Sequence, residues 1–313
     1  MAKADPTDHI GRRFKLRGLY ILAAVVERGS MAKGASHLGM SQPAVSEAIA
    51  SLEETLKVRL LDRGSRGIEP TIYAQALLKR STVIFDELSQ GLRDIEYLTD
   101  PATGDVRIGC PESLAAGFVP AMIDEFSRRH PQVTFHVTDM NIAALEFREL
   151  RERKVDLMLG RVSTACADDE IDIDTLFDDR LLVVASRESR WARRRTITPA
   201  ELVNEPWILA PPNNLGRALF SEAFRAHGLE APTAKVTSNS MNVRMHLLAS
   251  GRFLTFIAES LLRQNAKRWS LKALPVALGT QQLTVAVATL KNRTLSPTAR
   301  LFLEHIKAAS PSS

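Results

Sequence analysis

The residues from Ser41 to Ser51 carry the most distinctive recognition chemistry in this sequence. The amide of Gln42 can donate and accept a hydrogen bond together, which matches the edge of an adenine base. The residues after Gln42 are mostly small, so a helix that carries them presents a slim face at its N-terminal end. A helix needs such a face to enter a DNA major groove, which is about 12 Å wide.

The elements around this run are two short helices joined by a tight turn. Ser30 has the residue type of an N-cap for a helix over Met31–Leu38, and Gly39 is well placed to end that helix. Ser41 can cap the second helix in the same way. The second helix carries one apolar stripe, formed by Val45, Ile49, Leu52 and Leu56. This pattern predicts a helix-turn-helix, although an ordinary helical hairpin shows the same features.

Two neighbouring segments favour DNA binding over the ordinary hairpin. Leu16–Glu27 is an apolar helical run that can supply a supporting first helix. Arg59–Arg63 and Ile68–Pro70 flank a loop with two glycines, which predicts a basic two-stranded wing. We therefore predict a winged helix-turn-helix over residues 14–70, after a loose tail at 1–13. Its expected DNA contacts are Ser30, Ser41, Gln42, Pro43, Ala44, Ser46, Glu47, Ser51, Arg63, Arg66 and Thr71.

The stretch 71–98 predicts one long helix with a sparse apolar stripe. Such a helix is too long to pack on a small winged domain alone, so its stripe must be buried elsewhere. It could be a core helix of the next domain, but a dimerisation helix is the preferred interpretation. The dimer contacts would come from Leu77, Ile84, Leu88 and Ile95. Residues 99–104 then form a linker rich in turn-forming residues.

Strands and helices alternate after Gly104, which predicts parallel sheets covered by helices in an α/β domain over 105–309. The expected strands are Val106–Cys110, Val133–Thr138, Val155–Leu159, Leu181–Ala185, Pro206–Leu209, a segment near Val236, Phe253–Ile257 and Leu283–Ala288. The expected helices are Leu114–Arg129, Ile142–Arg153, Leu215–His227, Met241–Ser250 and Pro297–Ala308.

Polar residues cluster where these strands end and helices begin, which is where α/β domains bind ligands. The expected ligand contacts are Pro111, Glu112, Ser113, Asn141, Arg161, Asn213, Asn239 and Ser240. Ser113 is most economically the N-cap of its helix, a role compatible with ligand contact. Arg161 could bind a carboxylate or another anion, or it could form a salt bridge at a hinge. A carboxylate at Glu112 would oppose an anion.

The segment from Gly29 to Thr71 resembles the N-terminal domain of the LysR-type transcriptional regulators. The resemblance rests on SQPAVS, then IASLEETLKVRLLDR, then a wing that ends in Pro-Thr, and the downstream order of elements agrees to about Ala309. Two departures are Ala32, where the family often has Thr, and Glu47, where a basic or polar residue is frequent. The second departure affects base preference rather than fold.

The resemblance implies a regulator that binds double-stranded DNA and responds to a small-molecule co-inducer held between two lobes like those of periplasmic binding proteins. It also implies a homodimer that pairs into a homotetramer, and contact with RNA polymerase if the protein activates. The expected lobes are 105–164 with 268–309, and 165–267. The chain would cross between them near Arg161–Ala167 and return near Asn265–Leu271.

Composition narrows the alternatives. The chain has 313 residues, 45% of them hydrophobic, and a net charge of +5, which is typical of a globular protein with several domains. Two cysteines, Cys110 and Cys166, suit a reducing cytoplasm, and a redox role for them is not expected. We expect no membrane span, export signal, metal site or cofactor. These expectations weigh against the two rival classes, a periplasmic solute-binding protein and an enzyme.

Overall fold

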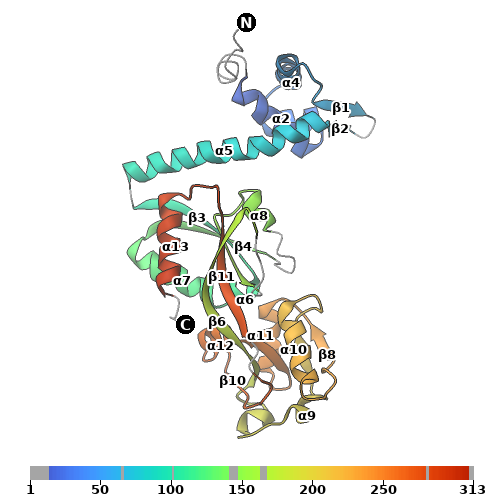
Figure 1. Cartoon of the computed structure of the whole chain (residues 1–313), viewed down its shortest axis with the longest axis vertical. Coiled ribbons are helices and arrows are strands. Elements are labelled where there is room, and N and C mark those ends of the chain that lie inside the picture. Colours follow the sequence, from blue (N-terminus) through green and yellow to red (C-terminus); the bar gives the residue numbers. More distant parts are fainter. Residues whose placement is uncertain are drawn as a thin grey trace. The chain divides into compact units, whose positions relative to one another are not determined.

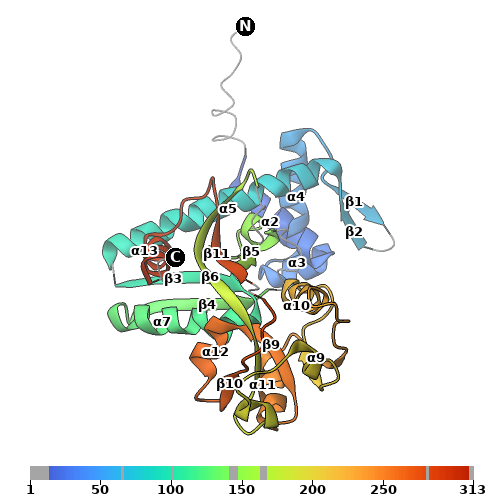
Figure 2. The same cartoon turned by 60° about the horizontal axis from the view of Figure 1, so that its bottom comes forward.

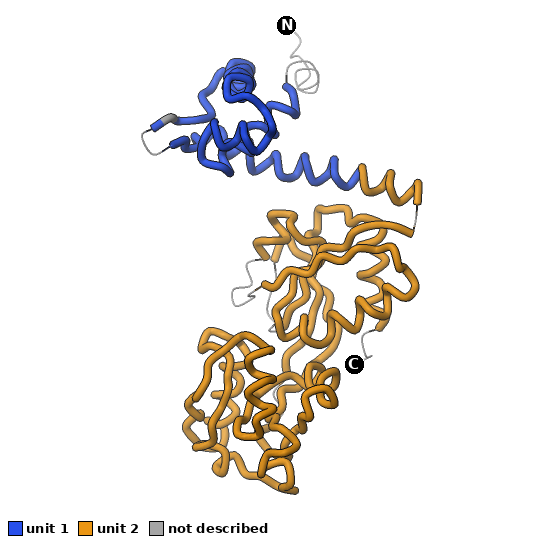
Figure 3. Tube along the Cα trace, turned by 180° about the vertical axis from the view of Figure 1, so that it is seen from behind, with its two compact units in different colours: residues 1–91 blue, residues 92–313 orange. Residues whose placement is uncertain are grey.

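The computed structural model describes residues 14–64, 67–100, 102–140, 147–162, 168–279 and 282–309. The chain divides into two compact units, residues 1–91 and 92–313 (Figure 3). The predicted tail at 1–13 and the candidates Arg66, Asn141 and Cys166 lie outside the described residues. Within the described ranges, no helix is both long enough and apolar enough to span a membrane.

The first unit has the predicted order of helices and hairpin (Figure 1). Its elements are α2 (Leu16–Arg28), α3 (Met31–His37), α4 (Gln42–Leu56), β1 (Leu61–Gly64), β2 (Gly67–Pro70) and α5 (Ile72–Thr99), which continues into the second unit. Both predicted N-caps are confirmed. The Ser30 hydroxyl accepts a hydrogen bond from the Lys33 N–H at 3.1 Å, and the Ser41 hydroxyl accepts one from the Ala44 N–H at 3.4 Å.

Two glycines set the geometry of the helix pair, Gly34 by close packing and Gly39 by its backbone conformation. A Cβ added at Gly34 would lie 2.8 Å from Val25 Cγ2, so only glycine allows α3 to pack this closely on α2. Gly39 has a φ of 63° and turns the chain toward α4. The buried residues of this core are Ile21, Leu22, Val25, Met31, Ala35, Val45, Ile49, Leu52, Leu60, Leu61 and Ala74.

The wing is fastened to the helices through backbone groups. The Glu53 carboxylate of α4 accepts hydrogen bonds from the N–H groups of Leu60 at 2.7 Å and Leu61 at 3.3 Å. On the second strand, the Ile68 N–H donates to the Gly29 carbonyl at 3.3 Å. These bonds attach β1 to α4, and β2 to the turn between α2 and α3.

Leu77, one of the four predicted dimer contacts on α5, differs from the other three in its surroundings. Leu77 is half-buried against the core of the winged domain. It lies one helical turn after Ala74, which is fully buried there, so the first turns of α5 belong to that core. Ile84, Leu88 and Ile95 are instead exposed.

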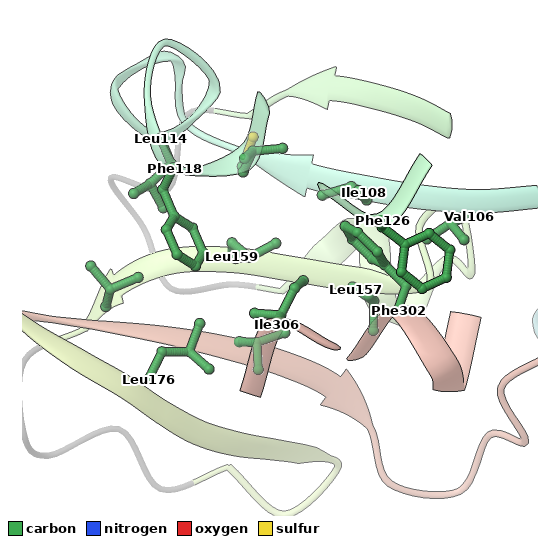
Figure 4. Close-up of a cluster of buried hydrophobic side chains, with 14 of the residues drawn as sticks. Val106, Ile108, Leu114, Phe118, Phe126, Leu157, Leu159, Leu176, Phe302 and Ile306 are labelled. Carbon is green, nitrogen blue, oxygen red and sulfur yellow. The ribbon is translucent and has the colours of Figure 1, made fainter. Parts of the chain in front are cut away.

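The second unit consists of two lobes, each built on a mixed sheet (Figures 1 and 2). The strand order of the first lobe is β4-β3-β5-β11-β6, with β3, β4 and β5 parallel and β11 antiparallel to its neighbours. Its elements are β3 (Thr103–Cys110), α6 (Glu112–Ala115), α7 (Phe118–Arg129), β4 (Gln132–Asp139), α8 (Arg148–Arg151), β5 (Leu157–Val162), β11 (Gln282–Leu290) and α13 (Pro297–Ala309). Side chains of β3, β5, α7 and α13 meet in its core (Figure 4).

The second lobe continues from the far half of β6. In it β6 pairs with β9 and β10, β9 with β7, and β7 with β8. The elements are β6 (Ile171–Ser186), η1 (Arg190–Arg193), α9 (Pro199–Leu202), β7 (Trp207–Leu209), α10 (Leu215–Arg225), β8 (Ala234–Thr237), α11 (Met241–Ala249), β9 (Leu254–Ala258), α12 (Glu259–Asn265) and β10 (Leu271–Ala273).

The crossings between lobes differ from those predicted. The strand β6 belongs to both sheets: Arg180 pairs with Gln282 of β11, and the next residue, Leu181, pairs with Ala258 of β9. The outward crossing therefore lies within this strand and not near Arg161–Ala167. The return is also later than Asn265–Leu271, because Leu271 pairs with β6 in the second lobe. The second lobe therefore runs from about residue 181 to 279.

Two predicted helices are wrong in extent. The helix expected over Leu114–Arg129 is split into α6 and α7, because Gly117 interrupts it where α7 approaches α12. A Cβ at Gly117 would lie 3.3 Å from Leu261 Cα of α12, in the other lobe. In the described part of Ile142–Arg153 the helix spans only Arg148–Arg151. The lobes also touch through Asn265, whose amide donates to the Ala116 carbonyl at 2.8 Å.

Candidate functional site

The outer face of α4 combines exposure with small side chains. Ser41, Gln42, Pro43, Glu47 and Ser51 are exposed. Ala44 and Ser46 are partly exposed, while Val45 and Ile49 on the opposite face are buried in the core. This face resembles that of a recognition helix, because its N-terminal turns are accessible to solvent and carry mostly small side chains.

Two other predicted DNA contacts, Arg63 and Thr71, lie outside α4. Arg63 lies in β1, where its backbone pairs with Ile68. Thr71 is the cap of α5: its hydroxyl accepts from the Ala74 N–H at 3.3 Å and donates to the Arg59 carbonyl at 2.9 Å. Thr71 therefore joins the wing to α5, and this structural role was not anticipated.

A cavity of about 470 Å³ lies between the two lobes of the second unit. It brings together the predicted residues Pro111, Glu112, Ser113, Arg161, Asn213 and Asn239. Ser240, also predicted, caps α11 beside it by accepting from the Val243 N–H at 3.4 Å. The walls are otherwise mostly apolar and include Leu181, Leu209, Phe220, Phe256, Ile257 and Leu261. Such a lining is typical of a site for a small molecule.

Arg161 and Ser113 form a polar cluster at the lobe crossing. Arg161 donates to the Ser113 hydroxyl at 2.7 Å and to Asp179 Oδ2 at 2.9 Å. The same Asp179 carboxylate accepts from the N–H of Ser260 at 3.0 Å and from its hydroxyl at 2.6 Å. Ser113 is not the N-cap that was predicted, because α6 begins one residue earlier, at Glu112. Arg161 was expected either to bind an anion or to form a salt bridge at a hinge, and in the structure it forms the salt bridge, with Asp179.

Two carboxylates of the first lobe line the cavity, Glu112 and Asp139. Glu112 faces the start of α11, where the Ser240 hydroxyl donates to its Oε1 at 3.4 Å. Asp139 ends β4 beside Cys110, and burial together with this carboxylate raises the pKa of the Cys110 thiol to about 11. A thiol with this pKa is protonated at neutral pH.

Arg244 is a cavity residue that the sequence analysis missed. Its side chain is buried on α11, 4% exposed, and donates to Thr255 Oγ1 at 2.6 Å and to the Phe256 carbonyl at 2.9 Å. Its Nε has no hydrogen-bond partner among the described residues. Burial lowers the pKa of Arg244 to about 10, and the negative charge of Glu112 opposes this shift.

Arg217 of α10 is the second missed cation. It lines the cavity with its guanidinium 5.6 Å from the centre of the Phe220 ring, and one terminal nitrogen is buried without a partner among the described residues. Burial lowers the pKa of Arg217. The signal in the sequence was an arginine on the apolar face of a helix. Arg217 shares a face of α10 with Phe220 and Phe224. Arg244 shares a face of α11 with Met241, Met245 and Leu248.

A winged helix-turn-helix joined to a two-lobed domain with a cavity between its lobes defines a class, the ligand-responsive DNA-binding regulators. Family models place the chain within that class. Residues 16–75 match "Bacterial regulatory helix-turn-helix protein, lysR family", and residues 99–311 match "LysR substrate binding domain". The chain belongs to the LysR family, so it is a DNA-binding transcriptional regulator modulated by a small-molecule effector.

Individual relatives agree with this family. The chain is 29% identical to the HTH-type transcriptional regulator GbpR of Azospirillum brasilense, over 95% of this chain and 87% of that protein. It is 28% identical to the transcriptional dual regulator GltC of Bacillus subtilis, over 93% and 96%. The crystal structure of CbnR, a LysR family transcriptional regulator, has the same fold, with a TM-score of 0.65 and 19% identity over 95% of this chain and all (100%) of that one.

Proposed function

We propose that occupation of the cavity between the lobes changes how this regulator binds its operator. The observation that carries the proposal is the cavity itself: it lies at the lobe crossing, where Asp179 is bonded to residues of both lobes. A ligand that prefers one arrangement of the lobes shifts the protein toward it. A coupling of about 1–3 kcal/mol would change operator affinity roughly 5- to 150-fold.

For DNA recognition we propose that Gln42 reads a base edge while the small residues of α4 allow close approach. Gln42 is exposed at the first position of the helix, where recognition helices contact bases. Arg63 and Arg66 of the wing would contact phosphates or the minor groove. Ser30, Ser41 and Thr71 serve mainly as caps in this proposal.

We further propose that the protein works as a homodimer through α5, and as a homotetramer by resemblance to the family. Leu88 is 49% exposed and Ile95 is 61% exposed on this helix, an apolar surface that a partner helix would cover. Contact with RNA polymerase follows if the protein is an activator. The relatives GbpR and GltC are transcriptional regulators, which favours binding rather than catalysis as the task of the cavity.

A DNA-binding assay on the full-length protein tests the recognition step. The probes are the promoter region next to its own gene and random duplex DNA at the same salt concentration, since phosphate contacts depend strongly on salt. Gln42→Ala should weaken operator binding by about 1–3 kcal/mol and leave random DNA nearly unchanged. Glu54→Ala, at the exposed far end of α4, is the matched control. Equal losses on both DNAs would show that Gln42 does not read sequence.

A further inference from the structure

Two arginines that line the cavity, Arg217 and Arg244, have no acidic partner among the described residues. Among the described residues neither Arg217 nor Arg244 forms an ion pair with a carboxylate within hydrogen-bonding distance, although the surroundings of each lower its pKa through burial. A buried guanidinium without an acidic partner is unfavourable and is normally paired. The Nε of Arg161 is also buried without a partner among the described residues, but its charge is paired, because the guanidinium donates to Asp179 at 2.9 Å.

The two arginines lie against neighbouring parts of one wall of the cavity, formed by Phe220 and Phe256. Arg217 lies over Phe220, the Phe220 and Phe256 ring centres are 5.4 Å apart, and the Phe256 carbonyl accepts from Arg244. Both arginines therefore lie beside the same apolar wall of the second lobe. A ligand with an apolar body against this wall would present its charged end to them.

We infer that the effector is a small organic anion whose carboxylate is held by Arg217 and Arg244, and that Glu112 competes with it for Arg244. The inference rests on the proposed function of the cavity and names its ligand class. Guanidinium groups bind carboxylates with paired N–H donors, and the apolar walls bury the rest of the molecule.

The carboxylate of Glu112 lies on the opposite side of the cavity from Arg244, so its removal tests the inference directly. Its carboxylate belongs to the first lobe but faces the start of α11, and its charge acts on Arg244 across the cavity. Glu112 is therefore an internal carboxylate that partly neutralises the same cation. Removing its charge while keeping its shape should strengthen the binding of an external carboxylate.

The test uses benzoate as the probe and benzamide as its uncharged counterpart, titrated into the full-length protein by calorimetry. A fragment of this size should bind with a Kd of roughly 1–10 mM, and benzamide should bind at least about tenfold more weakly. Arg217→Met and Arg244→Met should each remove the preference for the acid. Glu112→Gln should increase benzoate affinity several-fold without changing benzamide. Arg225→Met, an exposed arginine of the same helix α10, is the matched control.

Equal binding of acid and amide, or no benzoate binding up to about 50 mM, would overturn the inference. So would a Glu112→Gln variant with unchanged or weaker benzoate binding, a result that does not depend on how well Arg244→Met folds. Operator binding of the same samples tests the proposed function separately. If the protein prefers the acid but does not bind operator, the inference about the ligand holds and the proposed function is wrong. If it binds operator but shows no preference for the acid, the proposed function holds and the inference is wrong.

Discussion

The Arg161 guanidinium and the Asp179 carboxylate form a buried ion pair, 2.9 Å apart, with side chains only 10% and 2% exposed. Arg161 comes from the end of β5, and Asp179 from the point in β6 where the chain leaves the first lobe. Because Ser260 of the second lobe also donates to Asp179, the pair joins the two lobes, and its Arg161 lines the cavity.

Breaking this pair should destabilise the second unit. Arg161→Met leaves Asp179 buried without its cation, a change that costs about 3–5 kcal/mol when one partner of a buried pair is removed. Denaturant unfolding of the single variants Arg161→Met and Asp179→Asn, and of the double variant, measures this cost. The double variant should recover much of the loss. If Arg161→Met alone is neutral, the pair does not fasten the lobes.

Gly34→Ala should destabilise the winged domain by about 1–3 kcal/mol, because overpacking forces neighbouring atoms apart. The added methyl group would meet Val25 Cγ2 at 2.8 Å and Val25 Cα, a backbone atom, at 3.0 Å. Thermal unfolding gives the measurement. Gly18→Ala in α2 is the control, since its Cβ would come no closer than 3.8 Å to Leu52 and helix propensity favours alanine. A stable Gly34→Ala variant would contradict the packing argument.

Leu88→Asp should produce monomers that bind operator weakly while the winged domain stays folded. The reason is that Leu88 is exposed and apolar on α5, so a charge there disturbs a helix–helix contact but not the domain core. Sedimentation equilibrium with circular dichroism measures both properties. Lys79→Asp, an exposed polar position of the same helix, should stay oligomeric. A monomeric wild-type protein at micromolar concentration would exclude α5 as a dimer helix.

Stability should fall as pH rises above about 8.5, in part because of Cys110. Its thiol keeps its proton to about pH 11 in the folded protein, whereas an unfolded cysteine loses it near 8.5. Between these values the unfolded state binds fewer protons, so the free energy of unfolding decreases with pH. Denaturant unfolding at several pH values, in a Cys166→Ser background, measures the slope. Cys110→Ala should flatten it, and an unchanged slope would remove the argument.

The winged domain could be predicted closely because its signals are local. Ser30 and Ser41 sit at helix starts as caps, and Gly39 makes the turn between the helices. Each of these features depends on a few neighbouring residues, and the structure confirms all three.

The lobe crossing was missed because its signal is not local. The alternation Ile171-Asp172-Ile173-Asp174 has the period of a strand, but only pairing with β11 shows that it is continuous with Leu181–Ala185. Arg244 was overlooked for a related reason. Its place in an apolar stripe gains meaning only when α11 packs beside the cavity.

The close approach of Gly117 to Leu261 has a mechanical consequence. Because Gly117 has no side chain, the lobes come close together there, and the Asn265 amide donates to the Ala116 carbonyl at the same place. We therefore expect the lobes to rotate about this contact, which stays in place, rather than to separate from each other along their whole interface. For a given displacement of α10, the angle of rotation is then set by the distance of α10 from this contact, and it is smaller the farther from the contact the ligand binds.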